Sequence, residues 1–225
     1  CYGRIKQVNS MRTSFINALQ ALAEQDKRVM LLSGDLGFSV LEKFQKEFPD
    51  RFLNMGVAEQ NMIGTAAGLS LSGMKPYVYS IVPFATMRCF EQIRNDICYQ
   101  NVDVKIVGTG GGLAYGNLGP THHAREDIAI MRALPNMTIV CPCDPIETEL
   151  LVKESLKLNS PLYLRLGRGN EPIVHKEKPN LRIGKGITLR YGNDVAIIAT
   201  GNIVNNALTA AGLLAEKSIN ARVIS

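Results

Sequence analysis

Short apolar runs alternate with longer amphipathic segments along most of this chain. The apolar runs are rich in strand-forming residues, which favours buried strands, and the longer segments carry apolar residues at helical spacing. Strands are predicted at residues 29–33, 76–82, 104–108, 138–141 and 162–166, and helices are predicted after Ser10 and at residues 58–71, 86–99, 125–133 and 145–158. This alternation predicts an α/β fold with a doubly wound parallel sheet.

A sheet of this kind binds its ligand outside the carboxyl ends of its strands. In this chain those ends lead into the loops at residues 33–40, 80–85, 109–124 and 165–170. We therefore expect the functional side chains to gather in and beside these loops.

The pattern changes after residue 170. Residues 171–186 mix proline, glycine and charged residues without periodicity, which is typical of a linker. Further elements are predicted as a strand, a helix and a strand at residues 194–200, 204–217 and 221–224. We predict a first domain over residues 1–170 and the truncated beginning of a second, smaller α/β domain over residues 187–225, because about 40 residues cannot bury a core alone.

Composition and charge exclude several classes of protein. Hydrophobic residues make up 46% and charged residues 20% of the chain, as in a soluble globular protein. No apolar run reaches the roughly 20 residues of a membrane span and no secretory leader opens the chain, so we expect no membrane association. The net charge is +5, but lysines and arginines are scattered singly. This argues against nucleic-acid binding and favours a phosphorylated small molecule as ligand.

Cysteine usage indicates a reducing compartment. The five cysteines are an odd number in a chain large enough to bury its own core, so we expect a cytoplasmic protein. Cys141 and Cys143 are the one pair whose spacing suggests a metal site. Because this spacing is not CxxC and no histidine follows at ligand distance, we predict two buried thiols beside a strand end and no metal site in this chain.

Four stretches follow one another in the order SGDLG (33–37), MGVAEQNMIGTAAGL (55–69), PFATMRCFEQIRND (83–96) and GPTHH (119–123). In this order they resemble the pyrimidine-binding domain of the transketolase family, and the resemblance spans residues 10–170. The tail looks like the start of the family's C-terminal domain. The chain is especially similar to the C-terminal subunit of a split transketolase, and it is also similar to 1-deoxyxylulose-5-phosphate synthase.

The resemblance implies a thiamine diphosphate-binding fold in which Glu59 is the central residue. A glutamate at this place hydrogen-bonds a ring nitrogen of the thiamine aminopyrimidine and promotes the imino tautomer that deprotonates the thiazolium carbon. Phe84 matches the aromatic residue that stacks on the pyrimidine, and Ile81 stands where many relatives carry a second aromatic residue. Asp35 resembles an acidic residue near the thiazolium. The alternatives are that Glu59 and Asp35 only favour helix starts and that Phe84 is a core residue.

The resemblance also implies residues that act on the substrate. His122 matches the histidine of the family's G-x-T-H motif, where an imidazole can donate to, or exchange protons with, the substrate oxygen. His123 replaces a usual glutamine and is a further substrate-binding candidate. Arg88, Arg165 and Arg168 match basic positions that contact the substrate or its phosphate, although Arg88 could instead pair with a glutamate on its own helix.

Two departures from the family pattern affect the substrate. Leu118 stands where transketolases usually carry an aspartate that reads a sugar hydroxyl, and a leucine side chain cannot accept that hydrogen bond. The basic or imidazole residue that relatives place upstream falls within the glycine run 110–112. We therefore expect the chemistry to be kept and the substrate to differ.

The diphosphate half of the site has no counterpart in this sequence. The family holds Mg²⁺ and the diphosphate with a GDG motif and a later asparagine, whereas Gly34-Asp35-Leu36 is followed by no such pattern. We expect the chain to share thiamine diphosphate with an N-terminal-type transketolase subunit that holds the Mg²⁺, in an α2β2 assembly. The expected reaction transfers a two-carbon ketol or acyl unit between (phospho)sugar-type substrates.

Two other functions stay open. A β subunit of a 2-oxo acid dehydrogenase would share the fold, but the GPTHH loop speaks against it. A catalytically idle interaction subunit is favoured by Leu118 and the glycine run. The presence of Glu59, Phe84 and His122 together opposes that alternative, because a scaffold needs none of them.

Overall fold

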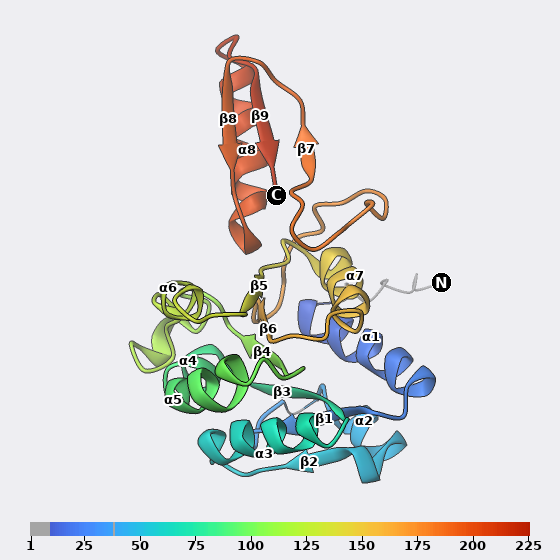
Figure 1. Cartoon of the computed structure of the whole chain (residues 1–225). Helices are drawn as coiled ribbons and strands as arrows, with labels where there is room; N and C mark the ends of the chain where they lie inside the picture. Colours follow the sequence, from blue (N-terminus) through green and yellow to red (C-terminus); the bar gives the residue numbers. More distant parts are fainter. Residues whose placement is uncertain (1–9, 38) are drawn as a thin grey trace, which may run out of the picture.

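A six-stranded parallel sheet forms the centre of the chain, which the computed structural model describes over residues 10–37 and 39–225 (Figure 1). The strand order is β2-β1-β3-β4-β6-β5, and all pairs are parallel. The strands are β1 (Val29–Ser33), β2 (Phe52–Asn54), β3 (Lys75–Ile81), β4 (Lys105–Thr109), β5 (Thr138–Val140) and β6 (Leu162–Leu166). The predicted doubly wound α/β fold is confirmed.

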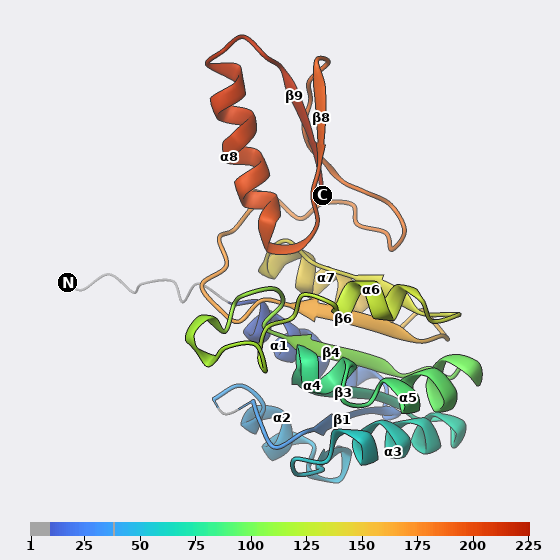
Figure 2. The ribbon, with the colours of Figure 1, turned by 90° about the vertical axis from the view of Figure 1, so that its left-hand side faces the viewer.

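Helices cover both faces of this sheet, because successive side chains of each strand point to opposite sides (Figure 2). Leu31 of β1 packs into a core with the helices of one face, whereas Leu32 packs into the core of the other. The first face carries α1 (Met11–Gln25), α2 (Glu42–Glu47) and α7 (Pro145–Ser155), and the second carries α3 (Glu59–Leu71), α4 (Val82–Thr86), η2 (Ile93–Tyr99) and α6 (Asp127–Arg132).

The prediction of one helix over residues 86–99 is wrong. The chain forms α4 (Val82–Thr86), then α5 (Phe90–Gln92) and the π-helix η2 (Ile93–Tyr99). Pro83 starts α4 early, because proline is suited to the first turn of a helix. The side chains of Thr86 and Cys89 then donate to backbone carbonyls within α4, which competes with continuation of the helix. Strand β2 was not predicted because three edge residues give too short a pattern.

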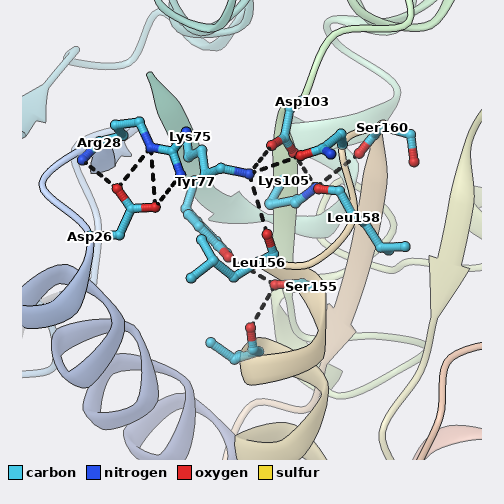
Figure 3. A network of polar contacts seen from close by, with 12 residues as sticks. Asp26, Arg28, Lys75, Tyr77, Asp103, Lys105, Ser155, Leu156, Leu158 and Ser160 are labelled. Carbon is cyan, nitrogen blue, oxygen red and sulfur yellow. Dashed lines mark hydrogen bonds and ion pairs between the residues drawn. The ribbon is translucent and has the colours of Figure 1, made fainter. Parts of the chain in front are cut away.

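Charged side chains are buried at the amino ends of β3 and β4 (Figure 3). Lys75 Nζ lies 2.7 Å from Asp103, and Lys105 Nζ also pairs with that carboxylate. Lys105 donates in addition to the backbone carbonyls of Leu158 and Ser160 in the turn before β6. Burial lowers the pKa of Lys105, and its bond to Asp103 opposes this. The network thus joins β3, β4 and the α7–β6 turn.

Asp103→Asn should destabilise the chain by about 3–5 kcal/mol, because it removes the one carboxylate that compensates two buried ammonium groups. The measurement is urea unfolding at pH 7. Glu149→Gln is the matched control, since Glu149 pairs with two lysines at the surface and should cost less than about 1 kcal/mol. Equal losses in the two variants would contradict this account of the buried network.

A second, smaller unit follows the sheet (Figure 2). Its strands pair in the order β7-β9-β8, with β9 antiparallel to β7 and parallel to β8, and α8 packs against β9. The unit contains β7 (Thr188–Arg190), β8 (Val195–Ile198), α8 (Val204–Ala215) and β9 (Ala221–Ile224). The elements expected after residue 187 are therefore present, with β7 in addition. The exact domain limits stay a prediction, and residues 1–9 lie outside the described part.

The linker is fastened to the amino end of α7 by two buried carboxylates. Asp144 caps α7 and also accepts hydrogen bonds from the backbone N–H groups of Val174 and His175, at 2.9 Å each. Glu147 lies 2.8 Å from His175 Nε2 and accepts a further bond from Ser225 Oγ. Burial lowers the pKa of His175, but the bond to Glu147 outweighs it and raises that pKa overall. For Glu147 burial raises the pKa, but the bonds from His175 and Cys143 N outweigh it and lower the pKa overall.

These shifts predict how stability depends on pH. The His175 contribution is full below its ordinary pKa of 6.5 and is lost as pH rises through the raised folded value. The Glu147 contribution is full above its ordinary pKa of 4.5 and is lost as pH falls through the lowered folded value. The pair should therefore stabilise the chain most between these two values. Urea midpoints measured across pH should decline on the alkaline side, and His175→Gln should remove that decline; an unchanged decline would contradict it.

Candidate active site

Glu59 begins α3 with a buried carboxylate whose exposed fraction is 1%. An acidic residue in the first turn of a helix is favoured by the helix dipole. Ser80 Oγ at the end of β3 lies 3.4 Å from Glu59 Oε1. Gly34 covers the carboxylate from the end of β1, where a Cβ atom would lie 3.3 Å from Glu59 Cγ. The loop after β1 can approach this closely because residue 34 has no side chain.

Arg88 supplies the cation that Glu59 needs. Its Nη1 lies 2.7 Å from Glu59 Oε2, and its guanidinium carbon lies 4.3 Å from the centre of the Phe84 ring. The alternative of a surface pair with Glu91 is not what the structure has. Arg88 instead bridges the buried carboxylate and the aromatic ring while 41% of its side chain stays exposed. Arg88 can do this because it lies at the break between α4 and α5.

Phe84, His122 and Tyr115 form a row of rings. The His122 ring lies edge-on to Phe84 at 5.1 Å and to Tyr115 at 5.7 Å, measured between ring centres. His122 Nδ1 lies 2.9 Å from Thr121 Oγ1. The guanidinium of Arg168 lies 4.8 Å from the Tyr115 ring centre. The fold thus joins the predicted residues Glu59, Arg88, Phe84, His122 and Arg168 into one chain of contacts.

Other predicted residues contact different partners. Asp35 has a φ of +56° and accepts a hydrogen bond from Asn54 Nδ2 at 2.9 Å, so it caps no helix. His123 Nε2 contacts the carbonyl of Gly116 at 2.9 Å. Ile81 is half-buried at the last position of β3, directly before the helix that carries Phe84. An apolar cover of Glu59 by Val57 was expected, but 75% of Val57 is exposed.

Arg165 is held by Asp127. Its Nε lies 2.7 Å from a carboxylate whose side chain is fully buried, and Tyr163 donates to the same oxygen at 2.7 Å. Burial lowers the pKa of Arg165, and the bond to Asp127 reverses this and raises it. Gly111 makes room for this guanidinium, because a Cβ atom there would lie 2.7 Å from Arg165 Cζ. These contacts hold β6 to α6.

Two residues of the site were not predicted. Tyr115 has an exposed fraction of 8%, and no sequence motif indicates it. Arg12 lies in the first turn of α1, and its buried Nε has no hydrogen-bond partner among the described residues. The positive charges of Arg12 and Arg168 oppose the rise in pKa that burial causes at Tyr115, so both lie near its hydroxyl. A cation at a helix amino end is disfavoured by the helix dipole, and that signal could have found Arg12.

One group of potential metal ligands converges within the described residues, in the linker anchor. Cys143 Sγ, Glu147 and His175 have ligand atoms within 4.8 Å of one another. The sequence places no histidine at ligand spacing, but the fold brings His175 from the linker. The Glu147 oxygens already accept bonds from His175, Ser225 and Cys143 N. Burial, then the charge of Glu147, raises the pKa of the Cys143 thiol, so the hydrogen-bonded state explains the group without an ion.

Two family models match the chain. Residues 7–173 match the transketolase pyrimidine-binding domain, and residues 184–225 match the transketolase C-terminal domain. The chain belongs to the transketolase family. The predicted resemblance is therefore confirmed. Four of its cysteines are free (Cys1 lies outside the described residues), and within the described part no helix is both long and apolar enough to cross a bilayer.

Similar transketolases include chains of split enzymes. One of the two kinds of chain named for the apulose-4-phosphate transketolase of Phocaeicola vulgatus is 43% identical over 95% of this chain and 69% of that protein. A 6-deoxy-6-sulfo-D-fructose transketolase subunit of a Clostridium species is 36% identical over 96% of this chain and 67% of that protein. A structure described as a split gene transketolase, inactive beta4 tetramer, is 41% identical with a TM-score of 0.87, over 96% of this chain and 70% of that one.

The two arginines near the end of β6 should respond differently to substitution. Arg165→Met should destabilise this transketolase chain by about 3–5 kcal/mol, because Asp127 would stay buried without its cation. Arg168→Met should cost about 1 kcal/mol or less, since an exposed guanidinium over a ring contributes little. Urea unfolding of both variants measures the difference. A stable Arg165→Met variant would show that Arg165 is free for another role.

Proposed function

We propose that this chain provides the pyrimidine-binding half of a thiamine diphosphate-dependent enzyme that transfers a two-carbon ketol unit between sugar-type substrates. The observation that carries the proposal is the buried Glu59 carboxylate joined through Arg88 and Phe84 to His122. The transketolase subunits to which the chain is similar are named for ketose substrates, which supports the same class of reaction.

The residues around Glu59 fit an aminopyrimidine ring. Such a ring needs a hydrogen-bonding carboxyl group at one edge and an apolar or aromatic surface against its face. Glu59 offers the first, and the half-buried side chains of Phe84 and Ile81 offer the second. Thiamine diphosphate, when bound, supplies a carbon nucleophile for the ketone carbonyl.

The two oxygens of Glu59 have different tasks in this proposal. Oε2 is engaged by Arg88 at 2.7 Å, which compensates the buried negative charge. Oε1 has only the long contact from Ser80 at 3.4 Å, so it is the oxygen that can share a proton with a ring nitrogen. Because the site is covered by Gly34, water has little access to that proton.

His122 is the residue that would move a proton at the substrate oxygen. Thr121 Oγ1 occupies Nδ1 of His122, which leaves Nε2 for the substrate. The rings of Phe84 and Tyr115 restrict the imidazole from two sides. A restricted imidazole loses less freedom when it meets the substrate, which favours proton transfer.

An anionic end of the substrate would lie beside Arg12 and Arg168. Arg12 has a buried Nε without a partner among the described residues, and Arg168 is exposed beside Tyr115. Guanidinium groups suit phosphate because of their forked donors. Arg165 is the weaker candidate, since Asp127 and Ala124 O already engage it. Leu118, 47% exposed, offers no acceptor for a sugar hydroxyl, so the substrate should differ from the usual ketoses.

A partner chain would complete the site in the cytoplasm. The converging metal-ligating side chains of the described residues lie in the linker anchor, away from the network around Glu59 in the fold's connectivity. We therefore propose that an N-terminal-type transketolase subunit holds the diphosphate and Mg²⁺, in an α2β2 assembly. The relatives that are themselves named as single subunits of a transketolase support the need for a partner.

Glu59→Gln should lower kcat of the reconstituted complex at least about a hundredfold, because the amide cannot share a proton as the carboxyl group does. Arg88 can still donate to the amide oxygen, so the fold and the assembly should persist. Glu91→Gln is the matched control: Glu91 is exposed close by on α5, and its variant should keep full activity. The measurement is ketol transfer with a panel of ketose phosphates.

Assembly is measured on the same samples by size-exclusion chromatography. Full activity of Glu59→Gln would overturn the proposed mechanism. Failure of the wild-type chain to bind any diphosphate-site subunit from its host would favour the catalytically idle interaction subunit instead.

A further inference from the structure

Tyr115 is the inward-facing side chain among the large apolar residues of the loop that carries His122. Backbone bonds between Gly112 and Ala124, at 3.0 and 2.8 Å, close this loop at its base. Within it, Leu113 is 64% and Leu118 is 47% exposed, whereas Tyr115 is 8% exposed. The loop therefore turns one aromatic ring toward the body of the protein.

Gly110 provides the space that this ring fills. A Cβ atom at residue 110 would lie 2.0 Å from Tyr115 Cε2, which no packing adjustment of a rigid ring accommodates. Gly110 also has a φ of +85°, a conformation that favours glycine. The beginning of the glycine run is thus matched to Tyr115, just as Gly111 is matched to the guanidinium of Arg165.

The ring contacts two residues of the proposed site at once. One contact is the edge-on packing of His122 at 5.7 Å, and the other is the guanidinium of Arg168 at 4.8 Å. Burial raises the pKa of the Tyr115 hydroxyl, so the ring is neutral at physiological pH. A neutral, buried ring has few orientations, and it restricts whatever packs against it.

We propose that Tyr115 is a positioning residue that sets both the His122 imidazole and the Arg168 guanidinium, so that proton transfer and binding of the anionic end of the substrate depend on one ring. This inference rests on the proposed function and deepens it. It assigns to the Gly110–Tyr115 pair the place that an ionic side chain takes in the usual family pattern.

The first test uses the chain alone and needs no activity. The ring protons of His122 are followed by NMR in the wild type, Tyr115→Phe and Tyr115→Leu. Loss of the ring should move the His122 resonances, because ring-current shifts depend on the neighbouring aromatic face, whereas Tyr115→Phe should leave them near the wild-type positions. Unmoved resonances in Tyr115→Leu would overturn the inference.

The second test uses the reconstituted complex. Tyr115→Leu should raise KM for a phosphorylated ketose about threefold to tenfold and should also lower kcat, since both contacts are lost. Tyr115→Phe should restore both values. Arg168→Met in the Tyr115→Leu background should then add less to KM than it adds in the wild-type background, because the two side chains act together.

The outcomes separate the two proposals. Additive effects of Tyr115→Leu and Arg168→Met, or a Tyr115→Phe variant as impaired as Tyr115→Leu, would overturn the positioning role while the proposed function stands. A wild-type complex that transfers no ketol unit from any ketose would overturn the proposed function. In that case an NMR change confined to Tyr115→Leu would still establish that the ring orients His122.

Discussion

The burial of one carboxylate organises the candidate site. Glu59 lies at a helix start with 1% of its surface exposed, and a buried carboxylate needs a compensating cation. Arg88 meets this need from the break between two helices. Once Arg88 is committed to Glu59, its guanidinium lies over Phe84, and the Phe84 ring then limits where His122 can lie. The acid, the aromatic surface and the imidazole are therefore positioned together.

Substantial parts of this arrangement could be predicted from the sequence. Buried strands such as β1 and β6 have strong apolar patterns because both of their faces are covered, and their limits match the prediction. Glu59, Phe84 and His122 lie in motifs whose order carries the resemblance. Motifs place residues along the chain, and the parallel topology then brings their loops to one edge of the sheet.

The remainder depends on contacts between residues far apart in sequence. Arg165 and Arg168 look alike in the sequence, but a fully buried Asp127 on α6 holds only the first. The anchor of the linker was not predictable because His175 reaches Glu147 from a segment without periodicity. The break after α4 depends on side-chain bonds to the backbone, which a helical apolar pattern does not encode. Side-chain pairing in three dimensions therefore decides what periodicity leaves open.

The buried lysines and Asp103 lie at the amino ends of β3 and β4, whereas the loop that carries Tyr115 and His122 follows the carboxyl end of β4. Stability and chemistry are thus assigned to opposite edges of the same strands. A lineage can exchange residues in the 110–122 loop without weakening the charged network that holds the strands together. The division makes the chain evolvable: new substrate preferences can arise by mutation of one loop while the scaffold is inherited unchanged.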